Sequence, residues 1–418
     1  MFDVKKARIL LLGAGMQGLA TLHDLCNSPD VSRVTAVDID VSPLQEYLSK
    51  LPSDKVRVIR ADARDQSALS DLLGAEKAIV VALLPRSFHI PLIRTAINNG
   101  VNLVTANSLV NPAELDCSKV EATKAEIAKL HEEAVEKGVT ILPEFGMEPG
   151  IDLVLAGQAV RELNEVHELY LYTESFPQSQ ELSTIDGDAI ISPFKGRLKS
   201  YFRPGRTLHY RPARILQDGH VIDIPAEEVF TPAQNHMIHL EGVGALEAYP
   251  NGNSMHYANL LGIRGTVRSV GRFALRWPGH CEFWRTLVKL KFLDEKAIQV
   301  KTKSVVPREC LTALLESQAM YSKDEGDIAV VRVDARGIKD GKRRRVIYQV
   351  IDRTDTLTGY TALARTTGFT ASIGAQMIHR GLIKKRGILS PARDIPFPQF
   401  SDELEKRRIY VAHSVQPW

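Results

Sequence analysis

The sequence predicts an α/β fold in which a doubly wound parallel sheet is joined to a second, α+β domain with a mixed sheet. Residues 1–145 alternate short apolar runs with helical patterns, which is typical of repeated βαβ units. From residue 146 onward, alternating strand patterns are separated by polar, proline-rich loops, and this favours an α+β domain. A chain of 418 residues is long for a single core, so two domains are expected.

The first domain is expected to contain six parallel strands with helical stretches between them. The predicted strands cover residues 8–12, 34–38, 56–60, 78–83, 102–105 and 139–142. A charged amphipathic helix is predicted over 119–137, ending at Gly138. In such a sheet, ligands bind beyond the carboxyl ends of the strands.

The start of the chain carries the most specific motif. An apolar run ends at Leu12 and is followed by Gly13, Gly15 and Gly18 in G-x-G-x-x-G spacing, and a second apolar run ends on Asp38. The first glycine allows a tight turn, the second lets the backbone approach a pyrophosphate, and the third lets the helix pack on the strand. The helix N-terminus favours phosphates, and the acid suits the ribose hydroxyls. This is the pattern of a Rossmann dinucleotide site.

The residues expected to contact the dinucleotide lie in this motif and at the ends of the following strands. They are Gly13, Gly15, Met16, Gln17, Gly18, Asp38, Asp62, Ala82 and Leu83. The charge of Asp38 would repel a 2′-phosphate, so NAD is favoured and NADP is the other possibility. Arg64 is the nearby cation that would reverse this preference, although a solvated surface charge is the simpler interpretation.

Two of the strand ends allow alternative interpretations. Asp62 follows the third strand, where its carboxylate suits an adenine amino group, but a helix N-cap for the segment near Asp65 is equally compatible. Asn107 and Ser108 follow the fifth strand and are candidates for binding the substrate. Polar residues at such positions also simply begin loops.

Composition restricts the class of protein. The net charge is only +3, so no nucleic-acid partner is expected, and the basic run 342–345 follows Asp340-Gly341 as part of a solvated hairpin turn. Four cysteines show no metal-type or redox-type spacing, which predicts no metal site and free thiols in a reducing compartment. No signal peptide and no membrane-spanning stretch are recognised, so a soluble, cytoplasmic protein is expected.

The segment 142–157 predicts the edge of a cleft between domains. A strand ends there, a loop carries Glu144 and Glu148, and Asp152 falls in the first turn of a new helix. Farther along, the second domain is rich in arginines, which suit an anionic substrate. Arg203 and Arg206 are the candidates for this role.

Three further features of the second domain are informative. His280 follows a Pro-Gly turn, and its near-neutral pKa makes it a candidate proton carrier; a polar residue at a helix start is the alternative. Residues 328–336 and 344–352 predict a two-stranded hairpin. An apolar helix running to Ile378 is expected to cross back onto the first domain, and the tail from Pro391 is expected to be irregular and to wrap the surface.

Several stretches together resemble the saccharopine dehydrogenase-like family, specifically glutamate-forming saccharopine dehydrogenases and lysine 6-dehydrogenases. They span most of the chain in the expected order: GAGMQG (13–18), LLPRSFH (83–89), EFGMEPGID (144–152), EAYPNGNS (247–254), RWPGHCEFW (276–284), EGDIAVVRVDARG (325–337) and ARTTGFTASIGAQMI (364–378). The resemblance implies a dinucleotide domain of residues 1–145 and 365–418, a substrate and dimerisation domain of residues 146–364, and a homodimer.

The resemblance also implies a reaction, namely hydride transfer between a nicotinamide and the carbon of a secondary amine, through an imine. The small-molecule substrate would then be an amino acid of lysine metabolism. Glu148 takes the place of the acid in the family's G-L-D-P-G segment, and we expect it to hold or deprotonate the substrate amine. A loop acid that supports the turn is the simpler alternative. Asn251 is the candidate substrate contact in the Tyr-Pro-Asn segment.

This chain departs from the family on the substrate side. Glutamate-forming members tend to carry Arg-Asp after Tyr-Pro-Asn, whereas Gly252-Asn253 stand here, so an expected carboxylate clamp is missing unless Arg203 or Arg206 replaces it. The segment 172–177 also differs from the glycine-rich loop of those enzymes. Asp38 adds a third difference, because the glutamate-forming reaction is commonly NADP-linked.

Three functions therefore remain open from the sequence. The first is a saccharopine-type amino-acid dehydrogenase, and the second is a lysine 6-dehydrogenase that deaminates free lysine. The third belongs to another class, a non-catalytic dinucleotide-binding protein that senses redox state or assembles with partners. The polar groups expected around the cleft, among them Asn107, Glu148 and His280, speak against the third.

Overall fold

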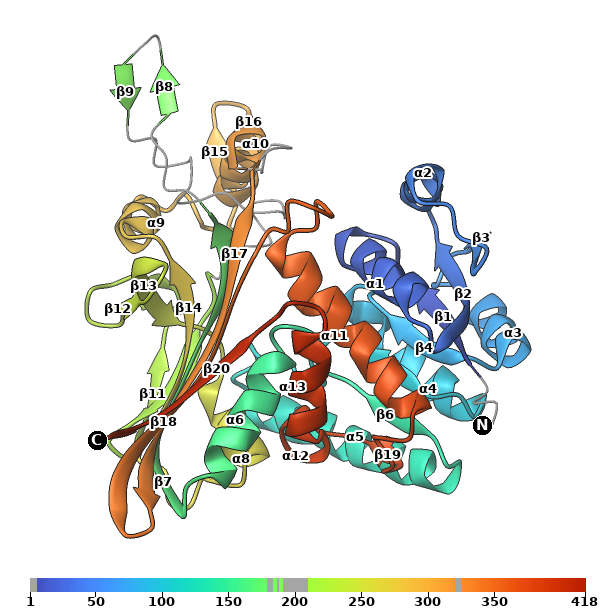
Figure 1. Cartoon of the computed structure of the whole chain (residues 1–418). Helices are drawn as coiled ribbons and strands as arrows, with labels where there is room; N and C mark the ends of the chain where they lie inside the picture. The colour runs from blue at the N-terminus through green and yellow to red at the C-terminus, as the bar shows by residue number, and fades with distance from the viewer. Residues whose placement is uncertain (1–5, 179–182, 186–187, 191–209, 320–324) are drawn as a thin grey trace.

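The computed structural model describes residues 6–178, 183–185, 188–190, 210–319 and 325–418. Two sheets organise the molecule, and Figure 1 shows the N-terminal one at the right and the larger second sheet at the left. This is the predicted combination of a doubly wound sheet and a mixed-sheet domain, so the predicted fold class is confirmed.

The first sheet has seven parallel strands in the order β19-β6-β5-β4-β1-β2-β3. Its strands are β1 (Ala7–Leu12), β2 (Val31–Asp38), β3 (Val56–Arg60), β4 (Ile79–Ala82), β5 (Leu103–Thr105), β6 (Thr140–Leu142) and β19 (Gly387–Ile388). All six predicted strands are present within a few residues of their expected bounds. The seventh comes from the far end of the chain.

Helices cover both faces of this sheet, because successive strand residues point to opposite sides. Ile9 and Leu11 of β1 pack with the cluster that contains α1, whereas Leu10 and Leu12 pack with α3, α4 and α5. The helices are α1 (Met16–Asn27), α2 (Ser42–Lys50), α3 (Gln66–Glu76), α4 (His89–Asn98) and α5 (Cys117–Glu136). A 3₁₀ turn, η1 (Arg86–Phe88), leads into α4.

The second sheet has nine strands, seven of them in the order β11-β10-β14-β7-β17-β18-β20, with β13 pairing β14 and β12 pairing β13. Only β14 and β7 pair in parallel. The strands are β7 (Glu165–Pro177), β10 (Ala213–Gln217), β11 (His220–Ile224), β12 (His236–Leu240), β13 (Gly244–Pro250), β14 (Ser269–Arg276), β17 (Asp327–Lys339), β18 (Lys342–Arg353) and β20 (Val411–Pro417). The predicted hairpin is confirmed as β17–β18, turning at Asp340 and Gly341, both with positive φ.

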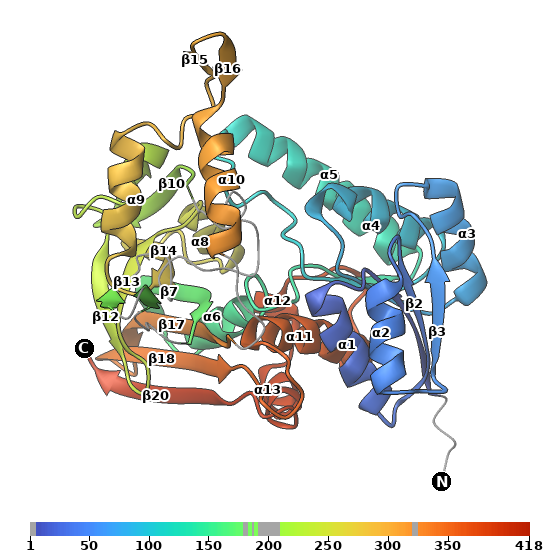
Figure 2. The ribbon, with the colours of Figure 1, turned by 90° about the horizontal axis from the view of Figure 1, so that it is seen from above.

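The helices of the second half lie against this sheet and between the two domains, as the view from above in Figure 2 shows. They are α6 (Ile151–Arg161), α8 (Ser254–Leu260), α9 (His280–Lys289), α10 (Pro307–Ala319), α11 (Ala362–His379), α12 (Pro391–Asp394) and α13 (Phe397–Glu405), together with the 3₁₀ turn η2 (Ala226–Glu228). Two small ribbons complete the described elements: β8 (Ser183–Ile185) with β9 (Asp188–Ile190), and β15 (Ile298–Val300) with β16 (Lys303–Val305).

Helix α11 returns the chain to the first domain, as predicted. A Cβ on Gly368 would lie 2.5 Å from the Gln17 carbonyl oxygen, so the missing side chain lets α11 press against α1. The Thr21 hydroxyl donates to the Gly368 carbonyl at 2.8 Å, and Ser28 donates to Gln376 at 2.8 Å. One apolar cluster consequently runs through both domains without interruption.

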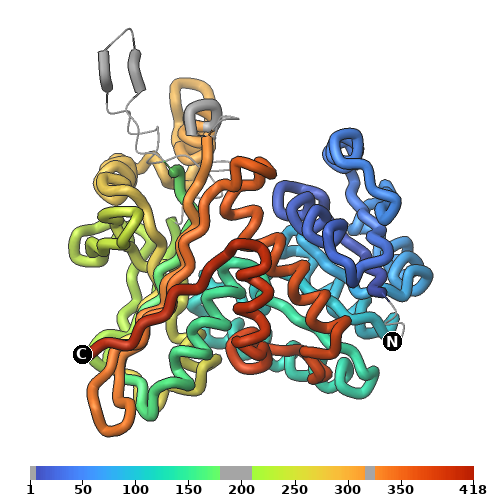
Figure 3. Tube along the Cα trace, in the orientation of Figure 1, coloured from blue at the N-terminus to red at the C-terminus, as the bar shows by residue number. Residues whose placement is uncertain are grey.

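The C-terminal tail is not irregular, and that prediction is wrong. It forms α12, α13 and the edge strand β20, which pairs with β18 from Val411 to Pro417 (Figure 3). The prolines that suggested an irregular tail sit at helix starts, where their missing N–H costs nothing. The pairing of β20 with the second sheet also differs from the expected boundary, which placed all of 365–418 with the first domain.

Candidate functional site

The glycine motif forms the turn between β1 and α1. Gly13 has φ +95°, and a Cβ there would lie 2.7 Å from the Leu83 carbonyl oxygen. A Cβ on Gly18 would lie 2.0 Å from the Gly13 carbonyl oxygen, whereas a Cβ on Gly15 would meet nothing within 4 Å. No described side chain caps the N-terminus of α1, so its first N–H groups remain available for an anion. The turn therefore fits a dinucleotide pyrophosphate.

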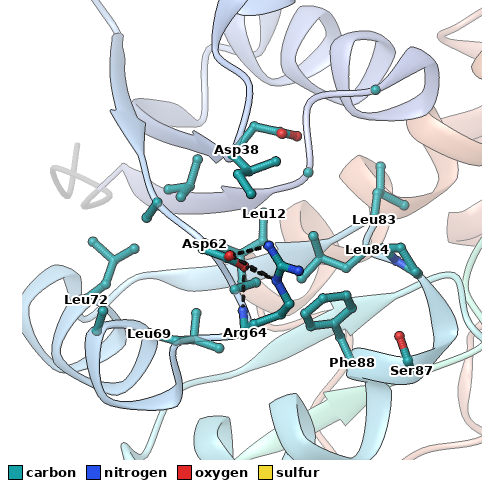
Figure 4. A pocket seen from close by; sticks show the side chains of 18 residues that line it. Leu12, Asp38, Asp62, Arg64, Leu69, Leu72, Leu83, Leu84, Ser87 and Phe88 are labelled. Atoms are coloured by element: carbon teal, nitrogen blue, oxygen red, sulfur yellow. Dashed lines mark hydrogen bonds and ion pairs between the residues drawn. The ribbon is translucent and has the colours of Figure 1, made fainter.

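A cavity of about 490 Å³ opens beside this turn, at the carboxyl ends of β1 to β4 (Figure 4). Five of the predicted cofactor residues line it: Gly13, Gly15, Asp38, Asp62 and Leu83. The other four are not among the lining residues: Met16, Gln17 and Gly18 lie in the first turn of α1, and Ala82 lies at the end of β4. Its walls are otherwise mostly apolar, which suits an adenine ring and a ribose.

Asp38 ends β2 and faces the glycine turn. Its Oδ2 accepts a hydrogen bond from the Ala14 N–H at 2.6 Å, and its Oδ1 accepts from the Asp40 N–H at 3.0 Å. The carboxylate therefore holds the glycine turn in place. Its negative charge beside the turn disfavours a 2′-phosphate there.

The two interpretations of Asp62 can be compared directly. Asp65, not Asp62, caps α3, accepting from the N–H groups of Ser67 and Ala68. Asp62 instead binds the Arg64 guanidinium through both carboxylate oxygens, at 2.6 to 3.0 Å, and Figure 4 shows this pair on the cavity wall. The N-cap interpretation of Asp62 is therefore wrong, and Arg64 is exposed but paired.

The ends of β4, β5 and β6 are tied together by the second group of predicted residues. The Asn107 side chain donates from Nδ2 to the Leu84 carbonyl at 2.9 Å. The main-chain carbonyl of Asn107 accepts a hydrogen bond from the Glu144 N–H at 3.1 Å. The Ser108 carbonyl accepts from Arg86 at 2.9 Å. Glu144 Oε1 accepts from the Leu109 N–H at 3.0 Å. These bonds connect the dinucleotide side of the sheet with the segment that carries Glu148.

Glu148 forms a buried ion pair with Arg272 of β14, which belongs to the second domain. The two side chains are only 8% and 6% exposed, and the guanidinium also lies 5.2 Å from the centre of the Tyr257 ring. Asn251 donates its N–H to the Arg272 carbonyl at 2.8 Å, which brings the Tyr-Pro-Asn segment to the same place. The pair thus joins the loop after β6 to strand β14 of the second sheet.

The residue after Asn251 is Gly252, and close packing disfavours any side chain at this position. The residue has φ +70°, and a Cβ there would lie 2.6 Å from the Pro112 carbonyl oxygen and 3.5 Å from Nη1 of Arg272. The guanidinium of Arg272 therefore approaches the backbone at a position that has no side chain.

Two more acids are buried behind Glu148. Burial raises the pKa of Glu144 to about 7, opposed by the hydrogen bond from Leu109 and by Arg86 and Arg272. Burial also raises the pKa of Asp152 to about 7, although the N–H groups of Gly150 and Leu153 bind its Oδ1. Among the described residues, nothing hydrogen-bonds Asp152 Oδ2. Both carboxyl groups change charge near neutral pH.

This leads to a prediction for stability. Because the folded pKa of Glu144 exceeds its ordinary value of 4.5, folding favours the protonated acid, and this stabilisation is lost as the pH rises through about 7. The Glu144→Gln variant, neutral at all pH values, should therefore gain on the order of 2 kcal/mol relative to the parent between pH 5 and 8. Urea unfolding across that range measures the difference. Parallel pH profiles for parent and variant would contradict the assignment.

His280 lies in a different place. It starts α9 and stacks on Tyr249 with ring centroids 5.6 Å apart, within the cluster that contains Phe230 and Trp284. The N-terminus of α9 is capped by Glu247, which accepts from the N–H groups of Gly279 and Cys281. The structure thus does not bring His280 together with Glu148 and Arg272. Arg203 and Arg206 lie outside the described residues.

The most consequential residue at this site, Arg272, was not singled out from the sequence among the arginines of the second domain. Arg272 and Glu148 are 124 positions apart, so nothing in their spacing reveals the ion pair. The available signal was an arginine between the apolar residues Val270-Gly271 and Phe273-Ala274-Leu275, because a charge inside a buried strand requires a partner.

The described residues contain neither a metal site nor a membrane-spanning helix. There, no group of three or more His, Cys, Asp or Glu side chains is arranged to hold a metal ion, and all four cysteines are free thiols. None of the described helices combines the length and apolarity that a bilayer span requires.

Comparison with known proteins agrees with this geometry. Residues 9–142 match the model of the saccharopine dehydrogenase NADP binding domain, and residues 146–409 match that of the saccharopine dehydrogenase C-terminal domain. The NADP+-dependent, L-glutamate-forming saccharopine dehydrogenase of Saccharomyces cerevisiae is 26% identical over 96% of this chain and 98% of its own. Mouse mitochondrial alpha-aminoadipic semialdehyde synthase is 23% identical over 92% of this chain but only 45% of its own length.

A solved structure shows the same fold. The apo saccharopine dehydrogenase (L-Glu forming) from Saccharomyces cerevisiae superimposes with a TM-score of 0.80 at 21% identity, covering 98% of this chain and 100% of that one. The two family models together span nearly the whole chain. The dinucleotide turn lies in the first matched region, and both members of the Glu148–Arg272 ion pair lie in the second. The chain belongs to the saccharopine dehydrogenase family.

Proposed function

We propose that the protein is an NAD(P)-dependent oxidoreductase that acts on the CH–NH group of an amino-acid substrate, as saccharopine dehydrogenases do. The observation that supports this most is the buried Glu148–Arg272 pair at the carboxyl edge of a dinucleotide-binding sheet. Substrates of such sheets bind beyond that edge. Membership of the saccharopine dehydrogenase family supplies the reaction class.

Different residues of the chain bind the dinucleotide and handle the substrate proton. The glycine turn and the cavity beside it hold the dinucleotide, which supplies the hydride acceptor when bound. Oxidation removes a hydride from carbon and a proton from nitrogen, which leaves an imine that water then converts to a carbonyl compound and an amine. We assign to Glu148 the acceptance of the proton from the amine, and its ion pair with Arg272 orients the carboxylate for this role.

The test is the absorbance at 340 nm with saccharopine, lysine and related amines, using NAD+ and NADP+ in turn. Turnover with saccharopine supports the proposal. Tight dinucleotide binding without turnover of any amine would instead favour the non-catalytic sensor.

Glu148 provides the sharpest variant for this proposal. We expect Glu148→Gln to keep dinucleotide affinity and to reduce kcat about 100-fold, because the amide cannot take a proton, and general-base catalysis contributes about 10²- to 10⁴-fold. The pH profile of kcat should also lose its acidic limb. Full turnover with an unchanged pH profile would exclude this role and leave Glu148 as a structural partner of Arg272.

A second candidate is oxidation of free lysine, as in lysine 6-dehydrogenases. Gly252 favours it, because the arginine that glutamate-forming relatives tend to carry at this position cannot be accommodated beside Pro112 and Arg272. Lysine has one carboxylate where saccharopine has three, so it needs fewer cationic contacts. Turnover of lysine without turnover of saccharopine would decide for this candidate.

The cofactor preference is a separate prediction. The matched family model is named for NADP, whereas Asp38 places a negative charge beside the glycine turn. Asp38→Asn keeps an acceptor for the Ala14 N–H but removes the charge, so the ratio of NADP affinity to NAD affinity should rise about 10-fold, equivalent to about 1.4 kcal/mol. Titration of both dinucleotides by quenching of protein fluorescence measures the ratio. An unchanged ratio would mean that Asp38 does not select the cofactor.

The assembly and location of the protein are further proposals. We propose a homodimer because of the resemblance to the saccharopine dehydrogenase family. We propose a cytoplasmic location because the four cysteines are free thiols. Light scattering on the purified chain measures the mass directly, and a monomeric mass would reject the dimer.

A further inference from the structure

A second cavity, of about 770 Å³, lies between the two domains and has no assigned role. Helix α5 and the segment from β19 to α12 form its walls on one side, and α8 of the second domain closes it. It shares no lining residue with the cavity beside the glycine turn. Its volume is in the range of sites that hold small molecules, which is about 300 to 1,000 Å³.

The interior of this cavity is apolar over much of its wall. The apolar lining residues are Leu109, Val110, Ile127, Ala128, Leu260, Ile388 and Leu389. Burial lowers the pKa of His256, which also lines it, to about 4, so this imidazole is neutral at physiological pH. A short aliphatic chain would be favourable against such a wall.

The charged lining is predominantly basic. Four basic residues, Lys124, Lys385, Arg386 and Arg393, face three acids, Glu132, Glu144 and Asp394. Lys385 and Asp394 neutralise each other at 2.6 Å. Within the described chain, neither Arg386 nor Arg393 has a carboxylate within ion-pair distance, and Arg386 donates only to the Thr140 hydroxyl, at 2.8 Å. Two guanidinium groups are therefore available to an anion.

A buried polar atom supplies an independent observation. Ser390 lines the cavity, is 5% exposed, and its hydroxyl oxygen has no hydrogen-bond partner among the described residues. A buried hydroxyl left in this state costs about 1 to 3 kcal/mol. Its oxygen is enclosed in the observed rotamer, so a ligand oxygen in the cavity would satisfy it once the side chain rotates toward the cavity.

We infer that this cavity is a second ligand site, which binds a small aliphatic carboxylate. Arg386 and Arg393 hold the carboxylate, Ser390 adds a hydrogen bond, and the apolar wall takes the chain. The inference goes beyond the proposed function, because it concerns binding at a place that contributes no residue to the dinucleotide turn. Since α5 and α8 come from different domains, an occupied site would also join them.

The test uses the full chain saturated with dinucleotide and measures binding of glutarate by calorimetry, with uncharged glutaramide as the matched ligand. We expect glutarate to bind with a Kd in the millimolar range or below and glutaramide not to bind. Arg393→Gln should weaken glutarate binding at least ~10-fold, and Ala128→Phe, which fills the cavity from an exposed helix position, should abolish it. Arg64→Gln, on the other cavity, should have no effect.

Two outcomes would overturn the inference. One is that glutarate does not bind to the parent protein. The other is that its binding is lost in Glu148→Gln but kept in Arg393→Gln and Ala128→Phe, which would place glutarate in the amine site instead. Because the readout is binding and not turnover, failure of the proposed amine oxidation would leave this test unaffected.

Discussion

Replacing Arg272 with methionine should lower the free energy of unfolding by about 3 to 5 kcal/mol, the usual cost of breaking a buried ion pair. The Glu148 carboxylate would remain 8% exposed with its charge uncompensated. The cation–π contact with Tyr257 would be lost as well. Urea unfolding followed by tryptophan fluorescence measures the loss. The variant should also lose amine turnover, because the charge and orientation of Glu148 depend on the guanidinium.

The matched control is the double variant Arg272→Met with Glu148→Met. Replacing both members of a buried pair by apolar residues is often nearly neutral, so the double variant should recover most of the lost stability while remaining inactive. The difference between the single and double variants isolates the cost of the unpaired carboxylate. A single variant within ~1 kcal/mol of the parent would contradict the buried pair.

Gly18→Ala should weaken dinucleotide binding at least ~100-fold, because the new Cβ would lie 2.0 Å from the Gly13 carbonyl oxygen, so the turn must open. A shift of this size corresponds to about 2.7 kcal/mol. Displacing the turn also breaks the hydrogen bond between Ala14 and Asp38. Fluorescence titration with NAD and NADP measures the effect, and the thermal midpoint of the apo protein should fall too.

Gly15→Ala is the comparison that separates the two causes. A Cβ at position 15 meets nothing within 4 Å, and its φ of −67° is ordinary for any residue. The apo stability of this variant should therefore equal that of the parent, while its methyl group still intrudes on a bound pyrophosphate. If Gly18→Ala also left both stability and affinity unchanged, the close packing of α1 on β1 would not be needed for binding.

Local sequence patterns were sufficient to locate the main strands of the first domain. Most of the parallel strands contain a short apolar run, so β1 to β6 could be located from the sequence alone, whereas the two-residue strand β19 could not. The glycine spacing located the turn after β1. The same reasoning failed for β20, whose residues 411–417 are mostly exposed at the edge of a sheet. An edge strand buries little, so no apolar pattern marks it, and it is specified by its partner β18 instead.

The candidate site shows a similar limit. Asp38 and Asp62 could be placed because Asp38 ends one predicted strand and Asp62 follows another. Arg272 pairs with Glu148 only because β14 and the loop after β6, which are far apart in the sequence, meet in the folded chain, and no local rule contains that contact. The buried acids Glu144 and Asp152 have the same origin, since their pKa shifts arise mainly from burial by distant segments.

The path of the chain has a consequence for how the protein can be divided. After the second sheet is built, α11 returns to α1, β19 joins β6, and β20 then joins β18. Each domain thus includes chain from beyond the other, and no single cut yields two complete pieces. A fragment ending before Ala362 would lack the helix that covers α1 and the edge strands of both sheets. The two domains should therefore unfold as one cooperative unit, and the protein should be expressible only as a whole.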